Sequence, residues 1–196
     1  MLRTSLVCCL LAFTVMSASA QQPLPSSNSV AVEADVLAYG LPGYSGILNL
    51  SFANGFQVAA GTGRYEVPSF LLKGDDNYDA VQWKATSTSI QVVRVTYRFR
   101  GPMTSGPALG AVVLNQNWRL RAEHLNGESR FRPLSVGLTG GYYVYVWKRL
   151  YLYPTFAYTH NNVYSGEASL QGVPYTVEKW GPNASLHAGW DWEWKR

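Results

Sequence analysis

Three residues near the end of one predicted strand could carry out covalent chemistry: His160, Ser165 and Glu167. A histidine close to a serine and a glutamate can activate the hydroxyl as a nucleophile toward an acyl ester. Ser165 lies too far along an extended strand from His160 for contact to be assured. We therefore expect a polar strand end that runs into a solvated loop. Hydrolysis of an acyl ester stays open as an alternative.

A second set of residues places charge on segments that are otherwise partly apolar. Its members are Glu33, Asp35, Arg94, Arg98, Asp191 and Glu193. A cationic side chain facing lipid costs about 2–4 kcal/mol near the bilayer midplane, so these charges are expected inside a barrel. The interior of a small barrel is narrow enough to be filled by side chains. The sequence thus predicts a buried network of ion pairs, with conduction or proton transfer as the alternative.

Metal and cofactor sites are not expected. Residues 75–79 read Asp-Asp-Asn-Tyr-Asp, which resembles the start of a calcium-binding loop. The sixth position of that loop needs glycine and is Ala80, and the twelfth needs an acidic residue and is Thr86. His124 and His187 have no partners at metal-ligand spacing. We predict no metal and no cofactor.

The elements that must position these residues follow a period of two, which is most regular over residues 183–194. The even positions there are apolar and the odd ones are polar or glycine. The even positions are Ala184, Leu186, Ala188, Trp190, Trp192 and Trp194. Such alternation predicts a β-strand that separates two environments. Three tryptophans toward one end are typical of an aromatic belt facing a membrane interface.

Seven more segments show the same alternation. The predicted strands cover residues 30–38, 44–52, 56–65, 93–100, 108–120, 134–147, 150–162 and 183–194. On the fourth strand, valines and aromatic residues alternate with arginines, so the arginines must point inward. On the fifth strand, the same rule places the apolar set outside, namely Val112, Leu114 and Trp118. It places the polar set inside, namely Asn115, Asn117 and Arg119.

The connections alternate in length. The links at 53–55, 101–106 and 148–149 are short, whereas those at 66–89, 121–133 and 163–182 are long; residues 41–43 form one short outer link. Short periplasmic turns and longer outer loops are typical of outer-membrane barrels. This threading predicts two aromatic belts at the membrane interfaces. They consist of Tyr39, Tyr44, Phe52, Phe56, Phe99, Trp118, Trp147, Tyr151, Tyr158, Trp190, Trp192 and Trp194.

The first twenty residues have the pattern of a secretory signal peptide. Arg3 precedes an apolar stretch, and residues 18–20 read Ala-Ser-Ala, a small-residue cleavage site. We predict that residues 1–20 are a signal peptide, 21–29 a flexible lead and 30–196 the barrel domain. Both cysteines, Cys8 and Cys9, fall in the signal, so the mature chain would have no disulfide. The 16 basic residues exceed the 12 acidic ones too slightly to indicate a nucleic-acid partner.

Together these features predict an all-β protein, an eight-stranded antiparallel up-and-down transmembrane β-barrel. The signal peptide, the eight alternating strands and the aromatic last strand resemble the small outer-membrane β-barrel superfamily, which includes the outer-membrane protein A and X type barrels. Members usually end on an aromatic residue, whereas here Lys195 and Arg196 follow Trp194. The resemblance implies a monomer in the outer membrane of a diderm bacterium, inserted by the barrel assembly machinery and contacting lipid and lipopolysaccharide.

The expected function is non-enzymatic, serving envelope structure or surface contacts through the outer loops. Five basic residues near the outer rim could bind lipopolysaccharide phosphates: Lys84, Arg119, Arg121, Arg130 and Arg132. Two alternatives remain. The segment around His160 is similar to the outer-membrane lipid A deacylases, although their His-x-Ser spacing meets Asn at position 162. An exported soluble barrel that carries an apolar ligand would show the same alternation with its faces reversed.

Overall fold

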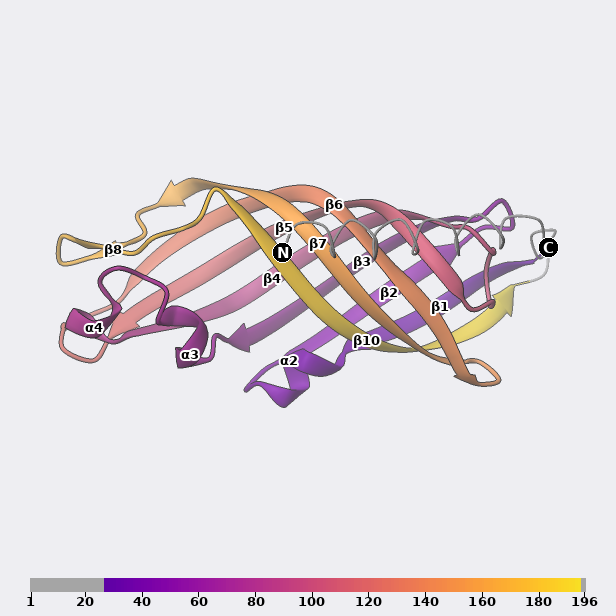
Figure 1. The fold of residues 1–196 in the computed structure, drawn as a ribbon, viewed down its shortest axis with the longest axis horizontal. Coiled ribbons are helices and arrows are strands. Elements are labelled where there is room, and N and C mark those ends of the chain that lie inside the picture. Colours follow the sequence, from indigo (N-terminus) through magenta and orange to yellow (C-terminus); the bar gives the residue numbers. More distant parts are fainter. Residues whose placement is uncertain (1–26, 195–196) are drawn as a thin grey trace, which may run out of the picture.

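The computed structural model describes residues 27–194, and eight strands in it close into one barrel (Figure 1). The barrel strands are β1 (Asn28–Asp35), β2 (Tyr44–Ser51), β3 (Phe56–Glu66), β4 (Trp83–Arg98), β5 (Gly106–Ala122), β6 (Ser129–Trp147), β7 (Leu150–Gly166) and β10 (Trp180–Trp194). Their order around the wall is β1-β10-β7-β6-β5-β4-β3-β2, and every neighbouring pair is antiparallel. The predicted fold class is confirmed. The predicted signal peptide lies outside the described residues, and β1 already begins in the predicted lead.

Short turns join the strands at the end where β1 begins and β10 ends, here called the inner end. They cover residues 52–55, 99–105 and 148–149. Gly55 has a φ of 89°, a left-handed conformation that glycine adopts without a steric penalty. Its amide donates to the Phe52 carbonyl oxygen and so closes the β2–β3 turn. The alternation of short inner turns with longer outer connections is as predicted.

Several strands extend farther toward the opposite, outer end than the sequence predicted. β4 begins at Trp83, although residues up to 89 were assigned to a loop, and β10 begins at Trp180. After Trp83 and Lys84, the missed start of β4 consists of Ala85 and small hydroxyl residues, with a register shift between Ser87 and Ser89. Because this part of the strand lacks large outward apolar residues, the two-face pattern did not reveal it.

The first outer connection also differs from the prediction. Residues 36–38 were expected to continue the first strand but belong to a short helix, α2 (Val36–Gly40). The Asp35 side chain accepts a hydrogen bond from the Leu37 backbone amide and thereby caps the helix. α2 packs against β10, β2 and β3, so β1 ends well below the outer end of its neighbours.

The remaining outer connections pack on one another. They contain α3 (Ser69–Leu72), α4 (Tyr78–Val81) and a hairpin of β8 (Ser169–Leu170) and β9 (Val173–Pro174). Asp75 joins them, since its carboxylate accepts from Trp83 Nε1 at 3.0 Å and from the Thr176 amide at 2.7 Å. Beneath them lies an apolar cluster formed by Leu72, Val81, Trp83, Ala85, Leu120, Ala122, Phe131 and Leu170. The outer end is therefore a packed cap.

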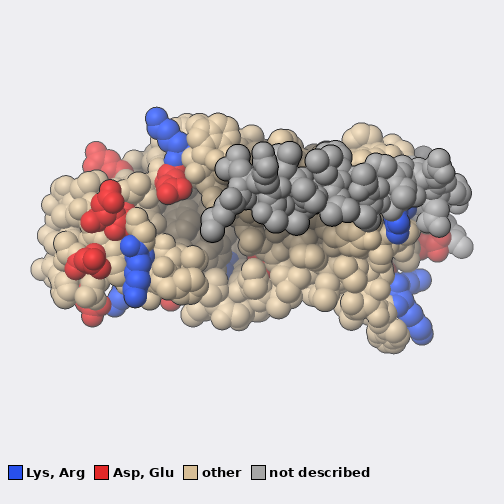
Figure 2. Space-filling model, viewed as in Figure 1, with Lys and Arg blue, Asp and Glu red and all other residues tan. Residues whose placement is uncertain are grey.

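The outward surface between the two ends is apolar. Its exposed side chains include Val32, Leu48, Leu50, Val58, Val93, Val95, Leu109, Val113, Val136, Leu138, Val144 and Phe156. On the face shown in Figure 2, most of the visible Lys, Arg, Asp and Glu atoms lie toward the two ends, with mainly uncharged residues between them. Within residues 27–194, no helix is both long and apolar enough to span a membrane.

The two faces of β5 are the reverse of the prediction. Val112 is 6% exposed and pairs with the inward Arg94, whereas the next residue, Val113, is 39% exposed. Paired residues point to the same face of a sheet, so inward Arg94 requires inward Val112. Leu114 and Trp118 accordingly face the interior, and the polar set assigned to the interior faces outward. The outward polar residues occupy the outer part of β5, beyond the apolar band.

Candidate functional site

The inner half of the barrel interior is filled by a polar network centred on Glu33 and Arg94. Arg94 Nη2 donates to Glu33 Oε2 at 2.9 Å and to Asn49 Oδ1 at 3.1 Å. Tyr151 Oη donates to the other carboxylate oxygen of Glu33 at 2.8 Å. The side chains of Glu33 and Arg94 are 0% and 5% exposed. The pair joins β1 to β4 across the interior, as the sequence predicted for these two residues.

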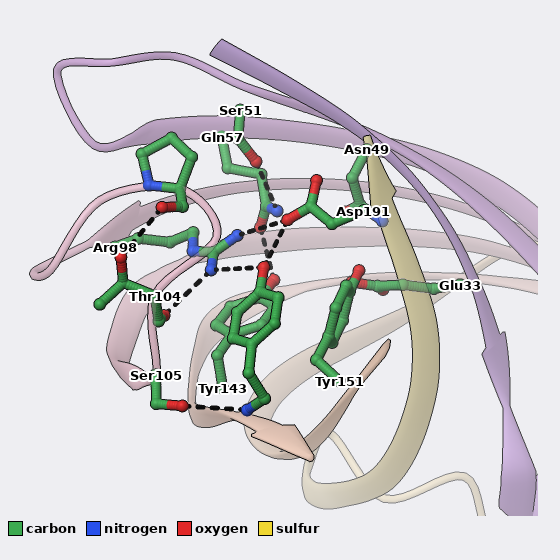
Figure 3. Close-up of polar contacts among 12 residues, drawn as sticks. Glu33, Asn49, Ser51, Gln57, Arg98, Thr104, Ser105, Tyr143, Tyr151 and Asp191 are labelled. Atoms are coloured by element: carbon green, nitrogen blue, oxygen red, sulfur yellow. Dashed lines mark hydrogen bonds and ion pairs between the residues drawn. The ribbon is translucent and has the colours of Figure 1, made fainter. Parts of the chain in front are cut away.

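A second ion pair lies closer to the inner end (Figure 3). Arg98 Nη1 is 3.7 Å from Asp191 Oδ2, and Arg98 Nη2 donates to Tyr145 Oη at 3.2 Å. Tyr145 Oη in turn donates to Asp191 Oδ2. The Arg98 guanidinium lies over the ring of Tyr143, 3.9 Å from its centroid, where the negative ring face attracts the cation. This group joins β4, β6 and β10.

Tyrosines fill the space between the two ion pairs. The rings of Tyr143 and Tyr153 stack with centroids 3.9 Å apart, and Tyr143 Oη donates to Gln57 Oε1 at 2.7 Å. Tyr151, predicted as a membrane-interface residue, is instead 0% exposed and inside the barrel. Its pairing with the inward Gly189 explains the error, because the β7 register places odd-numbered residues inside at this level.

Two members of the predicted six-residue network, Asp35 and Glu193, lie outside the network. Asp35 caps α2 at the end of β1 and makes no ion pair within residues 27–194. Glu193 is exposed near the inner end of β10. The predicted six-residue network therefore contains four of its members, to which the tyrosines and Gln57 add polar groups that alternation did not single out.

Above this network the interior opens into a cavity of about 660 Å³. One wall is apolar and comes from β2, β4 and β5 through Ile47, Ile90, Val92, Val112 and Leu114. The opposite wall carries small and polar groups of β6, β7 and β10, including Ser135, Thr155, Asn161, Asn183 and Ser185. Arg94 and His187 lie at the cavity's lower end, next to the polar network. The barrel thus has a filled inner half and a hollow outer half.

The aromatic residues occupy three environments. Phe52, Phe56, Phe99, Trp147, Trp192 and Trp194 are exposed near the inner end, and Tyr39, Tyr44 and Tyr158 are exposed toward the outer end. Trp190 is half-buried and packs edge-on against Trp147, with centroids 6.0 Å apart. Trp118, predicted at the outer interface, instead stacks on Phe131 at the top of the cavity, because β5 presents its even-numbered residues inward. Trp180, missed by the prediction, stacks on Tyr158.

The candidate esterase residues are not assembled into a catalytic group. His160 is exposed on β7 and contacts the ring of Trp180, with centroids 4.7 Å apart. Glu167 accepts a hydrogen bond from Ser169 at 3.2 Å. Within the described residues, no hydrogen bond joins His160 to Ser165 or Glu167. The arrangement shows no activated serine.

Three of the five basic residues at the outer rim share one acidic partner, Glu128. Glu128 accepts hydrogen bonds from Arg121 Nη2 at 2.8 Å and Arg130 Nη2 at 2.6 Å, and lies 3.5 Å from Arg119 Nε. Lys84 pairs with Glu123 at 3.6 Å. The hydrogen bonds from Arg121 and Arg130 lower the pKa of Glu128 to about 2. Three arginines around one carboxylate leave a net positive cluster that faces outward.

This cluster should respond to acid in a defined range. The pKa of Glu128 lies near 2 in the folded protein, and its ordinary value is 4.5. The stabilisation of the fold by the ionised Glu128 carboxylate is therefore complete above pH 4.5 and is lost as the pH falls toward 2. The carboxyl carbon-13 chemical shift of Glu128 should therefore titrate near pH 2, and Glu128→Gln should remove that resonance. A midpoint at the ordinary value would show that the arginines do not hold the carboxylate in solution.

No protein-family model matches the sequence, and no curated protein matches it significantly. Among solved structures, the chain is similar to the N-terminal β-barrel domain of Pseudomonas aeruginosa OprF, with a TM-score of 0.52 and 16% identity over 86% of this chain and 100% of that domain. Neisserial surface protein A gives a TM-score of 0.46 at 15% identity, covering 87% of this chain and 98% of that one. A major outer membrane protein from Thermus thermophilus gives a TM-score of 0.45 at 14% identity, covering 85% of this chain and 98% of that one. The fold is thus that of the small outer-membrane β-barrels.

Proposed function

We propose that this chain is an integral, monomeric outer-membrane protein without enzymatic activity, which serves the cell envelope through its outer half. Its exterior supports membrane insertion, because an apolar band separates two charged ends and exposed aromatic residues border the band. The fold it shares with outer-membrane barrels agrees with this location and with insertion by the barrel assembly machinery. Fractionation of cells, with gel mobility before and after boiling, tests the location and the closed barrel.

The barrel is also proposed to conduct no ions, and the observation that carries this part of the proposal is the filled inner half of its interior. Two buried ion pairs and a tyrosine stack cross the barrel there, tied together by hydrogen bonds from at least five strands. Side chains can fill the interior of an eight-stranded barrel, and here they do so in the inner half. A hydrated path through this region would require several of these buried groups to separate at once.

The purified protein is therefore expected to be silent in a planar lipid bilayer. Correct refolding would be established first by the band shift on boiling, and a wide porin would show that the bilayer detects channels. The result expected is the absence of stepwise conductance over the range in which the porin gives steps. Stable unitary steps from the refolded protein would contradict a closed interior.

The outer rim supports contact with lipopolysaccharide. Arg119 and Arg121 on β5 and Arg130 and Arg132 on β6 lie on outward faces of neighbouring strands, beyond the apolar band. Guanidinium groups bind phosphates well through paired hydrogen bonds. Since Glu128 neutralises only one charge, the patch keeps a positive excess where the phosphates of the outer leaflet would lie.

A further inference from the structure

The cavity in the outer half has an opening in the barrel wall. β1 pairs with β10 only as far as Asp35 and His187, whereas β10 continues outward from His187 to Trp180 alongside β7. Over residues 180–186, β10 has no strand partner on its β1 side within the described chain. Figure 1 shows α2 and α3 across from this free edge, and Figure 2 shows the surface hollowed between them.

The opening leads into the cavity and spans the outer part of the apolar band, from the level of Phe156, which pairs with Ala184, to that of Tyr158, which pairs with Pro182. Asn183 and Ser185 of β10 line the cavity on one side of the opening, and Leu37 and Ala38 of α2 line it on the other. Asn183 is exposed although it belongs to the inward face of β10. The outward neighbours at this height, Pro182 and Ala184 on β10 and Val36 on α2, are exposed and uncharged. A molecule in the outer leaflet would meet this opening directly.

The other routes into the cavity are obstructed. The outer connections pack over its top, where Asp75 joins Trp83 and the Thr176 amide and where Phe131 packs with Tyr175. The polar network fills the barrel below it. Entry from the side, at the depth of the hydrocarbon, therefore needs the least rearrangement.

The cavity floor offers buried nitrogen atoms that lack hydrogen-bond partners in the described part of the chain, one of them the guanidinium donor Arg94 Nε. Arg94 Nε and His187 Nδ1 are buried and have no hydrogen-bond partner within residues 27–194. The side chains of Arg94 and His187 are 5% and 8% exposed, and both line the cavity. A buried donor without an acceptor costs about 1–3 kcal/mol, so an acceptor placed there is favoured. Glu33 already neutralises Arg94, and Asp35 also lines the cavity, so binding of a fatty acid here requires one proton, either taken up by His187 or kept on the carboxyl group of the ligand.

We propose that the outer half of the barrel binds one long-chain fatty acid that enters from the outer leaflet through this side opening. Its carboxylate lies at the floor and accepts hydrogen bonds from Arg94 and His187. Its chain lies along the apolar wall of Ile47, Val92 and Leu114, and its end lies at the opening between β10 and α2. A volume of about 660 Å³ is in the range of small-molecule sites. The inference rests on the membrane placement proposed above, which the boiling shift tests on the same sample.

The test uses the purified chain in phospholipid nanodiscs and palmitate labelled with carbon-13 at the carboxyl group. A bound carboxyl resonance, distinct from that of palmitate in the bilayer, should appear and saturate at one per barrel. Leu114→Trp fills the apolar side of the cavity and should weaken binding about tenfold or more. Val113→Trp places the same side chain on the outward face of the same strand and should leave binding unchanged. Both variants must show the boiling shift before they are compared.

Absence of a saturable resonance from the folded wild-type barrel would overturn the proposal while leaving the membrane placement intact. Equal loss in the two tryptophan variants would overturn the placement of the chain inside the barrel.

A second comparison tests the floor and separates a free fatty acid from an acyl chain of a membrane lipid. Methyl palmitate has the same chain without the charge and should bind at least about tenfold more weakly than palmitate. His187→Phe should abolish this preference, whereas His187→Gln, which keeps a donor, should retain part of it. Equal binding of the ester by the wild-type protein would overturn the assigned carboxylate site and identify the ligand as an esterified chain.

Discussion

Replacing Arg94 by methionine is expected to lower the free energy of unfolding by about 3–5 kcal/mol, because it leaves Glu33 buried without its cation. Tyr151 would remain as a donor to Glu33 but carries no charge. Unfolding in urea of the barrel refolded into lipid vesicles, followed by tryptophan fluorescence and by the boiling shift, measures the change. A loss below about 1 kcal/mol would contradict an interior sealed by this ion pair.

Two matched variants identify the cause of that loss. Adding Glu33→Leu to Arg94→Met removes the remaining charge, so the double variant should regain much of the stability that the single variant loses. Arg130→Met removes an arginine that is paired with a glutamate in the same way but is exposed to solvent. It should leave the unfolding midpoint unchanged, since exposed ion pairs contribute little.

Val95→Arg is expected to destabilise the inserted barrel by about 2–4 kcal/mol, because an outward arginine near the bilayer midplane must leave water. Val95 is 44% exposed, and it pairs with Val58 and Ala111, which belong to the same outward face. On β4 it lies midway between Phe99 near the inner end and Gln91 toward the outer end. Unfolding from vesicles measures the effect.

Gln91→Arg provides the control on the same face of the same strand. Gln91 accepts a hydrogen bond from Asn115, among polar outward residues at the edge of the apolar band. An arginine there can reach the interface, so its expected cost is about 0–1 kcal/mol. If the two substitutions had equal and small effects, Val95 would be facing water, and the soluble carrier would become the better description.

The sequence predicts the barrel well wherever the membrane constrains one face of a strand. On β4, arginines alternate with valines, and only one orientation avoids charge in lipid; Arg94 and Arg98 are inside as expected. The short inner turns are also visible in the sequence, since Asn54 and Gly55 favour a tight turn. These two signals were sufficient for the number of strands and for the charged core of the network.

The same reasoning fails where the interior is not uniformly polar. Val112 and Leu114 line an apolar cavity, so the rule that apolar residues face outward reversed both faces of β5. The prediction for Tyr151 was wrong for a related reason, because an aromatic residue near the inner end can pack inside the barrel as well as face the membrane interface. The outward polar residues of β5 lie above the apolar band, where lipid no longer selects against them. Depth along the strand, which alternation does not report, decides these assignments.

The short first strand also affects the order in which the molecule can be built. The seam that closes the barrel consists of β1 and β10 pairing over Asn28–Asp35, all of it in the inner part of the wall. Closure can therefore be completed there while the outer part of β10 still has an unpaired edge, and before α2 docks beside it. The side opening is then the part of the wall that remains without strand pairing after closure. Its width is set by the five-residue helix α2 instead of by hydrogen bonds between strands.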